Sequence, residues 1–425
     1  MMEVQRVFID GFKNLSNINI NFDKLTALVA LNNFGKSNVL SALEFGIFFI
    51  QRRPIDKLKL MSSTKFIPLN KAIDNKSFTF GIELLMNLNS QNYYVYYEFK
   101  FNWALPNPKI IYESLKIKTD KKGNKFTQLI NRNEEEAKYK SSKTGKCSTK
   151  IKIESNELVI NKLQAYDNIY YLEVIKQINS FTFHTEKTLD TENSPYVQEI
   201  VIDKLQNEIY VESLPNIIFE LKNRYPNKYE LLINTYKELF PNMEDLQVIE
   251  FPLNPTDILN STDINKMQNK NIISPKAYFL RVKDKNLIEY VNFFSMSDGA
   301  IRIFTILTKI IIASITNISL IAIEEPENSM HPKLFKAYIQ IILQLLEQCK
   351  LIITSHSPYI INFIDPKWIY VGLNKKEGVA EFFSFKKIGR KKLLKDAEDL
   401  DMGMGDYLFS LISDNSSNID EYLEC

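Results

Sequence analysis

The stretch Ala30-Leu31-Asn32-Asn33-Phe34-Gly35-Lys36-Ser37 separates two apolar segments of different length. Residues 25–29 before it are long enough for a short strand, and residues 39–50 after it are long enough for a helix. A strand-to-helix turn of this composition predicts a loop whose backbone N–H groups, together with the helix dipole, hold phosphate groups. The alternative is an ordinary turn that precedes a lysine.

Within this loop, Lys36 is expected to reach the β- and γ-phosphates of a nucleotide, and the hydroxyl of Ser37 is expected to bind Mg²⁺. The pattern G-x-x-x-x-G-K-[ST] is broken at its first position, where Ala30 replaces glycine. A methyl group fits there only if the backbone φ of Ala30 is negative, so a reduced nucleotide affinity is one expectation. The candidate nucleotide-binding residues of this segment are Asn32, Asn33, Phe34, Gly35, Lys36, Ser37 and Asn38.

Two carboxylates follow a second apolar segment. Residues 318–323 are almost continuously apolar, as in a buried parallel strand, and Glu324 and Glu325 stand at its end. Buried parallel sheets bind ligands at the carboxyl ends of their strands. Because Mg²⁺ prefers oxygen ligands and retains several waters, Glu324 is expected to bind the metal with Ser37. Glu325 is the candidate general base for an attacking water, and a solvated acidic turn is the alternative.

A histidine follows a third apolar segment, residues 351–353, in Thr354-Ser355-His356-Ser357-Pro358. We expect His356 to contact the γ-phosphate and to orient the water, and the alternative is a structural histidine. His331 is more simply explained as a helix-entry residue. It precedes Pro332, which fits the first turn of a helix that runs through residues 334–346.

These motifs, in this order, resemble those of ATP-binding-cassette (ABC) type ATPases of the RecF, SMC and OLD (overcoming lysogenisation defect) group, including the compact bacterial members labelled AAA-family ATPases. Residues 7–15 resemble their first strand and its Phe-Lys turn, and Ser297-Asp298-Gly299-Ala300-Ile301-Arg302 resembles their signature motif. Residues 324–332 and 354–358 resemble their Walker B, D-loop and His-switch segments. Many of these ATPases have aspartate where this chain has Glu324.

The resemblance implies an α/β fold, an ABC-type P-loop ATPase head in which helices flank a mixed sheet, with ATP and Mg²⁺ as cofactors. It further implies that Ser297 and the backbone of Gly299 act on the nucleotide held by Lys36 of an opposite subunit. A homo-oligomer with at least a dimer of heads is therefore expected. Arg302 is expected either to support that interface or to be an exposed helical arginine, and Gln51 is not distinguished from a surface glutamine.

Length and composition describe an ordinary globular chain. The 425 residues allow two or three domains, and a hydrophobic fraction of 45% supports a substantial core. The chain has no run of about 18 apolar residues and no apolar signal-peptide core, so we expect a cytoplasmic protein without membrane contact. Three cysteines without metal or redox spacing fit a reducing compartment: Cys147, Cys349 and Cys425.

About 260 residues separate the phosphate loop from the signature motif, so the head is predicted to contain an antiparallel β and helical insertion. Alternation such as Tyr93-Val95-Tyr97-Phe99-Phe101 predicts antiparallel strands. Apolar positions such as Ile200, Leu205, Ile209 and 214–221 predict helices ending near Phe240-Pro241, without coiled-coil heptads. The expected domains are residues 1–55 (N-terminal part of the head), 56–160 (β-rich insertion with a Lys-rich loop), 161–270 (helical arm or lever), 271–375 (C-terminal part of the head) and 376–425 (acidic C-terminal tail).

Charge is unevenly distributed although the formal net charge is only +2. Residues 116–152 contain twelve Lys or Arg and four acidic residues, which predicts either contact with nucleic-acid phosphates or a solvated hairpin loop. The thirty residues after Lys395 contain nine acidic residues and no basic one. This acidic segment would repel DNA, and its residues 405–409 are apolar enough to fold back onto the head or to meet another protein.

Three functions remain open. The leading hypothesis is an ATPase that senses an invader-derived feature, such as DNA or a phage component, and controls a separate effector such as a nuclease or toxin. Anti-phage systems of the Septu and PARIS kind are organised in this way. OLD-type relatives carry a C-terminal TOPRIM nuclease, but only 67 residues follow Pro358, too few for that fold. The alternatives are a RecF-like DNA-repair ATPase and, because of Ala30, a non-hydrolysing ATP-gated scaffold.

Overall fold

The chain folds into two compact units. One unit contains Met1–Lys187, Ala313–Glu327 and Leu346–Cys425, and the second contains Thr188–Ile312 and Asn328–Leu345. The computed structural model describes residues 2–63, 67–73, 76–103, 107–121, 123–186, 199–203, 208–212, 214–252, 276–316, 318–328, 330–413 and 417–424.

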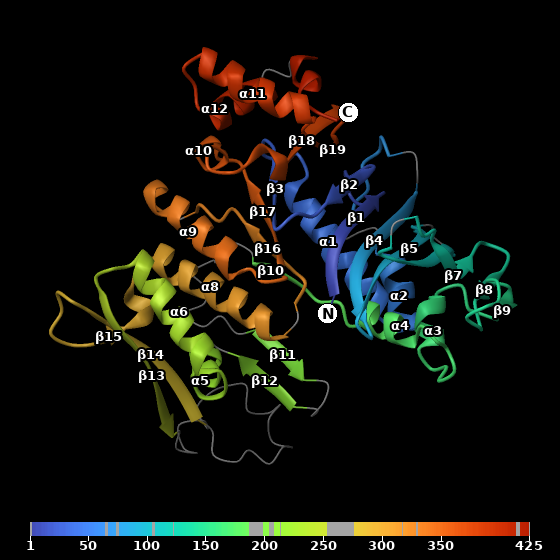
Figure 1. Cartoon of the computed structure of the whole chain (residues 1–425), viewed down its shortest axis with the longest axis horizontal. Coiled ribbons are helices and arrows are strands. Elements are labelled where there is room, and N and C mark those ends of the chain that lie inside the picture. Colours follow the sequence, from blue (N-terminus) through green and yellow to red (C-terminus); the bar gives the residue numbers. More distant parts are fainter. Residues whose placement is uncertain are drawn as a thin grey trace. The chain divides into compact units, whose positions relative to one another are not determined.

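A six-stranded, mostly parallel sheet forms the centre of the first unit (Figure 1). Its first five strands run parallel, and only the last, β19, is antiparallel to its neighbour. All five residues of β3 are buried, which explains why this strand has no polar alternation. In spatial order the strands are β10 (Phe183–Glu186), β16 (Leu320–Glu324), β17 (Lys350–Ser355), β3 (Leu25–Val29), β18 (Ile369–Lys376) and β19 (Val379–Ser384).

The register of three central strands brings distant motifs to one edge of this sheet. Glu324 of β16 pairs with Thr354 of β17, and Ser355 of β17 pairs with Val29 of β3. The phosphate loop follows Val29 directly, and α1 (Lys36–Gln51) begins after it. The predicted strand, loop and helix, and the predicted parallel strands before the carboxylates and the histidine, are therefore confirmed.

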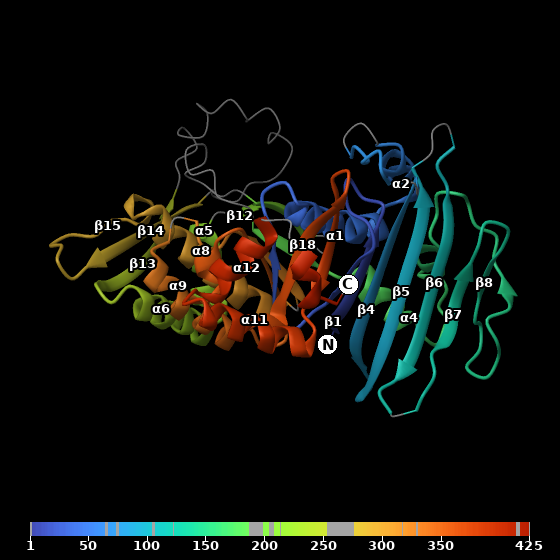
Figure 2. The same ribbon diagram turned by 90° about the horizontal axis from the view of Figure 1, so that it is seen from above.

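An eight-stranded antiparallel sheet forms the second layer of the same unit, and Figure 2 shows its long strands β4, β5 and β6 running side by side. The alternation predicted for β5 is confirmed, because Val95, Tyr97, Phe99 and Phe101 are buried. The rings of Phe99 and Phe101 each stack 4.9 Å from Phe49 of α1. In spatial order the strands are β2 (Ile18–Asn21), β1 (Met2–Asp10), β4 (Ser77–Leu88), β5 (Gln91–Asn102), β6 (Ile110–Thr119), β7 (Thr127–Arg132), β8 (Ala137–Tyr139) and β9 (Thr149–Lys150).

A buried lysine holds the end of α1. Lys57 of α2 (Pro54–Met61) is fully buried, and its ammonium donates to the carbonyl oxygens of Ile50 and Arg52 and to Asn161 Oδ1 at 2.8 Å. A cation is favourable at the C-terminal end of a helix, where carbonyl groups are left without helical partners. Burial nevertheless lowers the pKa of Lys57 to about 8. Two short helices complete this region, α3 (Val159–Leu163) and α4 (Leu172–Asn179).

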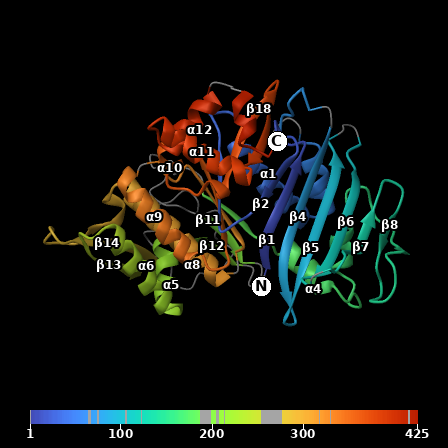
Figure 3. The same ribbon diagram turned by 45° about the horizontal axis from the view of Figure 1, so that its top comes forward.

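The acidic C-terminal segment folds back onto the rest of the first unit (Figure 3). This was one of the two expectations for residues 405–409, and the other was contact with another protein. Helix α12 (Met404–Ser413) packs on α10 (Pro358–Ile361), the helix that follows His356. A side chain at Gly405 would place its Cβ 1.9 Å from the carbonyl oxygen of Pro358, so only glycine allows this approach. The segment also contains α11 (Lys387–Asp399) and η4 (Ser417–Glu421), and η3 (Pro366–Trp368) precedes β18.

The second unit combines helices with short antiparallel sheets. Residues Ile200 and Ile209 lie in paired strands, so the helical prediction for them was wrong, and Leu205 lies outside the described residues. Ile200, Val201 and Ile202 form a short run of β-branched residues, which favours a strand. The elements are β11 (Glu199–Asp203), β12 (Glu208–Glu212), α5 (Leu214–Arg224), α6 (Pro226–Leu239), β13 (Met243–Pro252), β14 (Lys276–Asp284), β15 (Val291–Asn292), η2 (Phe293–Ser295), α8 (Asp298–Thr316) and α9 (Pro332–Leu345).

Helices α6 and α9 confirm the helix predicted to end near Phe240 and the one predicted to begin at Pro332. Helix α8 is, within the described residues, the one helix long and apolar enough to cross a membrane. Two thirds of its apolar window (67%) is buried inside the protein, as in the core helix of a globular fold.

The lowered pKa of Lys57 makes stability depend on pH. Between pH 8 and about 10.5 the folded state has lost the proton that the unfolded state still binds, so the free energy of unfolding rises with pH, by up to about 1.4 kcal/mol per pH unit. Lys57→Met removes this contribution. The stability advantage of the wild type over Lys57→Met should therefore increase between pH 7.5 and 9.5 in urea unfolding, whereas exposed Lys59→Met should show a constant difference.

Candidate nucleotide-binding and hydrolysis site

The phosphate loop is shaped by two residues in the left-handed region of backbone space. Asn33 has a φ of 66° and Gly35, directly before α1, a φ of 87°. A Cβ on Gly35 would also lie 2.9 Å from the Cβ of Ala380 in β19, so glycine is required for both conformation and space. The backbone N–H groups of the loop and of the first turn of α1 have no helical partners and suit an anion.

Lys36 lies inside this loop. Its side chain is only 7% exposed, and Nζ donates to the carbonyl oxygens of Ala30 at 2.8 Å and Leu31 at 3.0 Å. Burial lowers the pKa of Lys36, and the negative charges of Glu325 and Glu327 oppose that shift. The ammonium is thus held across the loop by weak carbonyl acceptors, which phosphate oxygens can replace.

Ser37 and Glu324 form a hydroxyl–carboxylate pair. The hydroxyl of Ser37, in the first turn of α1, donates to Glu324 Oε2 at 3.3 Å, and Glu324 is the last residue of β16. Within the described part of the chain, no group of three or more His, Cys, Asp or Glu side chains could hold a metal. A hydroxyl and a single carboxylate nevertheless suit Mg²⁺, which keeps most of its ligands as water and phosphate oxygens.

Glu325 and His356 form a second pair at the same edge of the sheet. The Nδ1 atom of His356 lies 2.9 Å from Glu325 Oε1. The backbone of Glu325 is held in place because its N–H donates to the carbonyl oxygen of Thr354 at 2.9 Å, and its φ is 47°. The carboxylate of Glu325 is therefore positioned by the neighbouring strand on one side and by an imidazole on the other.

The structure thus gathers five of the predicted residues, Lys36, Ser37, Glu324, Glu325 and His356, at one sheet edge. Asn32 and Asn33 are exposed in the loop, and Phe34 is half-buried. Asn38 instead uses its side chain within the protein, as described below. Ser297 and Gly299 belong to the second unit, at the start of α8, where Ser297 is exposed.

The family profile described as "AAA domain, putative AbiEii toxin, Type IV TA system" matches residues 25–362 of the chain. This match spans the phosphate loop, both carboxylates and the histidine. The chain belongs to this AAA-domain family. No curated protein matches the chain.

Solved structures of SMC heads are similar to this AAA-domain protein along most of its length. The "SmcHead bound to the C-winged helix domain of ScpA" is 13% identical, with a TM-score of 0.48, and the match covers 92% of this chain and 99% of that one. The "SMC head domain from Thermotoga maritima" is 11% identical, with a TM-score of 0.42, covering 90% and 99%. An Smc head from Pyrococcus furiosus, bound to the C-terminal domain of ScpA, is 12% identical, with a TM-score of 0.48, covering 94% and 100%. The family assignment rests on the sequence match.

Ala30 is accommodated by a glycine on the adjacent strand. The backbone of Ala30 does not have a positive φ, which meets the condition for a methyl group at this position. Gly372 of β18 lies beside it, and a Cβ on Gly372 would be 2.8 Å from the Cβ of Ala30. The missing first glycine of the phosphate-loop pattern is thus offset by a glycine that is remote in the sequence.

Glu327 is a residue of the site for which the sequence suggested no role. Its Oε1 accepts a hydrogen bond of 2.6 Å from the hydroxyl of Ser355, which in turn accepts from the N–H of Ser357 at 3.1 Å. Its Oε2 is buried without a hydrogen-bond partner among the described residues, and burial raises the pKa of Glu327. Glu327 therefore holds Ser355, and through it Ser357, the two residues that flank His356. In the sequence, the one sign of this role is that a further carboxylate stands two residues after Glu325.

The turn after β1 is hydrogen-bonded to the first turn of α1, which follows the phosphate loop. Lys13 Nζ donates to Asn38 Oδ1 at 3.0 Å, and Asn38 Nδ2 donates to Asn14 Oδ1 at 2.7 Å. Asn14 in turn donates to the carbonyl oxygen of Gly378, in the β18–β19 turn, at 3.2 Å. The sequence placed Asn38 at the nucleotide, whereas in this structure its side chain connects α1 to these turns.

Arg302 and Gln51 have structural partners. The expectation of an exposed arginine was wrong, because Arg302 is only 3% exposed and its Nη1 donates to the carbonyl oxygen of Asn328 at 3.2 Å. This bond joins α8 to the segment that follows Glu324 and Glu325. Gln51 donates to the carbonyl oxygen of Phe181 at 2.7 Å, and His331 accepts from the N–H of Lys333 at 3.3 Å at the start of α9.

The contact between Ala30 and Gly372 predicts a coupled pair of substitutions. Gly372→Ala should weaken ATP binding about tenfold, because the new methyl group pushes the phosphate loop out of position, and titration with a fluorescent ATP analogue measures the loss. Ala30→Gly in the same chain should restore part of the affinity, giving a coupling energy of about 1 kcal/mol. Additive effects of the two changes would contradict the contact.

The contacts of Glu327 predict a loss of turnover without a matching loss of ATP binding. Glu327→Gln and Ser355→Ala each loosen the turn that carries His356, so kcat should fall about tenfold or more in either variant. Burial raises the pKa of Glu327. As the pH falls, this carboxylate is therefore protonated at a higher pH than an ordinary carboxyl group. The decrease of kcat at acid pH that comes from protonation of Glu327 should therefore be absent in Glu327→Gln and remain in Ser355→Ala.

Proposed function

We propose that this protein is a Mg²⁺-dependent ATPase whose phosphate loop, carboxylate pair and histidine bind and hydrolyse ATP. The observation that carries this proposal is the meeting of two side-chain pairs, Ser37 with Glu324 and Glu325 with His356, at the sheet edge next to Lys36. The first pair suits a hydrated Mg²⁺, and the second suits a water molecule. A surface turn with a chance lysine would supply neither pair.

Each residue has a separate task in this proposal. Lys36 exchanges the carbonyl oxygens of the loop for phosphate oxygens, and Ser37 and Glu324 hold the metal through the hydroxyl and one carboxylate oxygen. Bound Mg²⁺ would neutralise charge that develops on the phosphates. Glu325 accepts the proton of the attacking water, and His356 orients the carboxylate of Glu325 through Nδ1.

Hydrolysis is proposed to require two copies of the chain. Ser297 is exposed at the N-terminal end of α8, whose first residue, Asp298, is exposed as well. The N-terminus of a 19-residue helix is a favourable position for a phosphate group. We infer that Ser297 and the backbone of Gly299 close on a nucleotide bound by a second copy. The Arg302–Asn328 bond then joins this contact to the segment after Glu325.

The biological role proposed is the regulatory subunit of a bacterial anti-phage defence system that controls a separate effector in the cytoplasm. The family description names a putative toxin of a type IV toxin–antitoxin system, which is a setting of the same kind. A neighbouring gene for a nuclease or toxin would favour this role. A non-hydrolysing ATP-gated scaffold is the second candidate, because Ala30 departs from the usual phosphate loop.

Turnover by Glu325→Gln decides between hydrolysis and a scaffold. Removal of the general base should lower ATP turnover by about 100-fold or more while ATP binding is retained. Glu398→Gln, the same chemical change at an exposed position of α11, should leave turnover unchanged. Wild-type turnover per subunit should rise with protein concentration, and mass measurements should show that ATP and Mg²⁺ promote assembly. Absence of turnover with ATP-dependent assembly in both wild type and Glu325→Gln would establish the scaffold instead.

A further inference from the structure

The outer face of the antiparallel sheet carries aromatic and basic side chains in register. Tyr94 and Tyr96 of β5 point away from the core, because the alternate residues of the strand are buried. Tyr94 pairs across the sheet with Lys118 of β6, and Tyr96 pairs with Lys116. We call the surface formed by Arg6, Tyr94, Tyr96, Lys116, Lys118 and Phe126 the aromatic–basic face.

Each lysine of this face lies over an aromatic ring. Lys118 Nζ is 4.9 Å from the ring centre of Tyr94 and 4.6 Å from that of Phe126, which is exposed. Lys116 Nζ is 5.9 Å from the ring centre of Tyr96. Among the described residues, no carboxylate forms an ion pair with either lysine. The two ammonium groups are therefore available to an anionic ligand.

The acidic groups of the face are engaged with other residues. Glu83 lies 3.1 Å from the guanidinium of Arg6, and Glu98 accepts a hydrogen bond of 2.5 Å from the hydroxyl of Tyr96. These contacts fix the position of Arg6 and of the Tyr96 ring. They leave Lys116 and Lys118 as the unneutralised charges of the surface.

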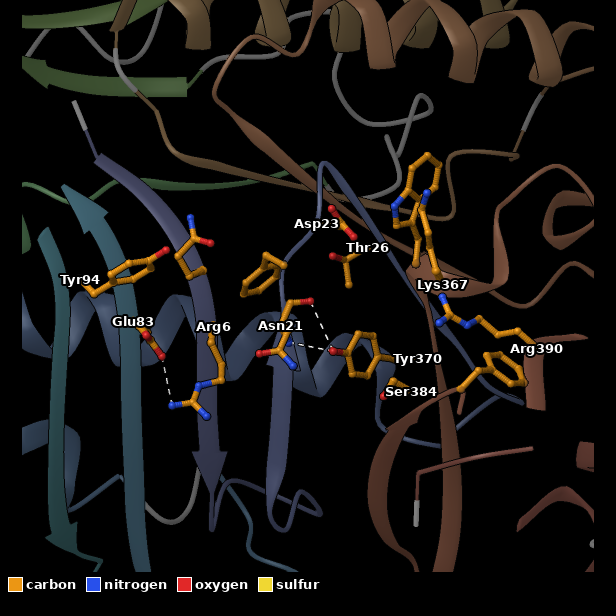
Figure 4. A pocket seen from close by; sticks show the side chains of 14 residues that line it. Arg6, Asn21, Asp23, Thr26, Glu83, Tyr94, Lys367, Tyr370, Ser384 and Arg390 are labelled. Carbon is orange, nitrogen blue, oxygen red and sulfur yellow. Dashed lines mark hydrogen bonds and ion pairs between the residues drawn. The ribbon is translucent and has the colours of Figure 1, made fainter. Parts of the chain in front are cut away.

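A polar pocket of about 460 Å³ adjoins the aromatic–basic face (Figure 4). Arg6, Glu83 and Tyr94 line it from the antiparallel sheet, Trp368 and Arg390 line it from η3 and α11, and Asp23 lines it as well. Two residues that line the pocket have a buried polar atom without a hydrogen-bond partner in the described residues: Nε1 of Trp368, and Oγ1 of Thr26, which is 1% exposed. A buried polar atom without a partner is costly, so these atoms indicate a ligand with hydrogen-bonding groups.

We propose that the aromatic–basic face and this pocket bind single-stranded nucleic acid. Rings two residues apart on a strand lie about 6.8 Å apart, which leaves room for unpaired bases to stack on them. A base that stacks on Tyr94 or Tyr96 displaces Lys118 or Lys116 from the ring, and the ammonium group then contacts the phosphate of that nucleotide. The nucleotide at the end of the strand enters the pocket, where Trp368 Nε1 donates to an acceptor of the base and Arg390 faces its phosphate.

The chemistry favours a single strand over a duplex. Bases in a duplex are stacked on each other and cannot also stack on Tyr94 and Tyr96, whereas unpaired bases can. The site is also separate from the ATP site. Thr26, which lines the pocket, is the second residue of β3, whereas the phosphate loop follows the last residue of β3. The pocket and the ATP site therefore lie at opposite ends of this strand.

Fluorescence anisotropy of a labelled oligothymidylate, measured on the full chain without ATP, tests this proposal. We expect the single strand to bind more tightly than a hairpin duplex of the same composition. Tyr94→Ala and Tyr96→Ala should each weaken binding about tenfold, whereas Tyr94→Phe and Tyr96→Phe, which keep the rings, should bind like the wild type. Trp368→Phe should weaken binding several-fold, because it removes the N–H group together with part of the ring.

The lysines are tested by salt dependence. Changing Lys116 and Lys118 together to Gln should reduce the slope of log K against log salt by about 1.4, the value for two phosphate contacts on a single strand. Changing exposed Lys143 and Lys146 to Gln is the matched control, because it removes the same charge from the nearby loop, and it should leave the slope unchanged.

Three results would overturn the proposal: no binding of the single strand, equal binding of the duplex, or loss of binding in the Lys143/Lys146 control but not in the Lys116/Lys118 variant. Thermal unfolding and ATP affinity show whether each variant is folded. Because binding is measured without ATP, failure of the proposed ATPase activity would not affect the result. Conversely, failure to bind nucleic acid would leave the ATPase proposal intact.

Discussion

The site depends on the parallel register of β3, β16 and β17. This register places Val29, Glu324 and Ser355 at one edge, although hundreds of residues separate the phosphate loop from the carboxylates. A shift of one residue in β16 would turn Glu324 to the opposite face and separate it from Ser37. Such a shift is unfavourable because residues 320–323 of β16 are buried, so moving Glu324 into the position of Ile323 would bury its carboxylate.

The phosphate loop is supported by parts of the chain that lie far from it in sequence. Gly35 packs against Ala380, Ala30 packs against Gly372, and the turn after β1 binds Asn38. All of these supports come from the first turn of the protein or from the β18–β19 hairpin. The C-terminal segment also supports the Glu325–His356 pair, because α12 packs directly on α10, the helix that follows His356. The chain after β18 thus contacts both the phosphate loop and the helix that follows His356.

The sequence predicted the elements whose own residues determine them. The short apolar strands, the strand-to-helix turn and the alternation of β5 are local patterns, and they were confirmed. Contacts between distant residues were not predictable, because no local pattern reports that Gly372 faces Ala30 or that Glu327 binds Ser355. The helical assignment around Ile200 failed for a different reason: isolated apolar positions fit both periods, and pairing with β12 selected the strand.

The buried charges of the site explain why its residues occur as pairs. A carboxylate or ammonium that leaves water is destabilised unless an opposite charge or hydrogen bond compensates it. Lys36 has the charges of Glu325 and Glu327 nearby, and Glu327 has the hydroxyl of Ser355. The charges of Lys36 and Glu327 therefore act on one another, and Glu327 is bonded to the turn that carries His356. Lys36, Glu327 and Ser355 thus connect the phosphate loop to the turn that carries His356.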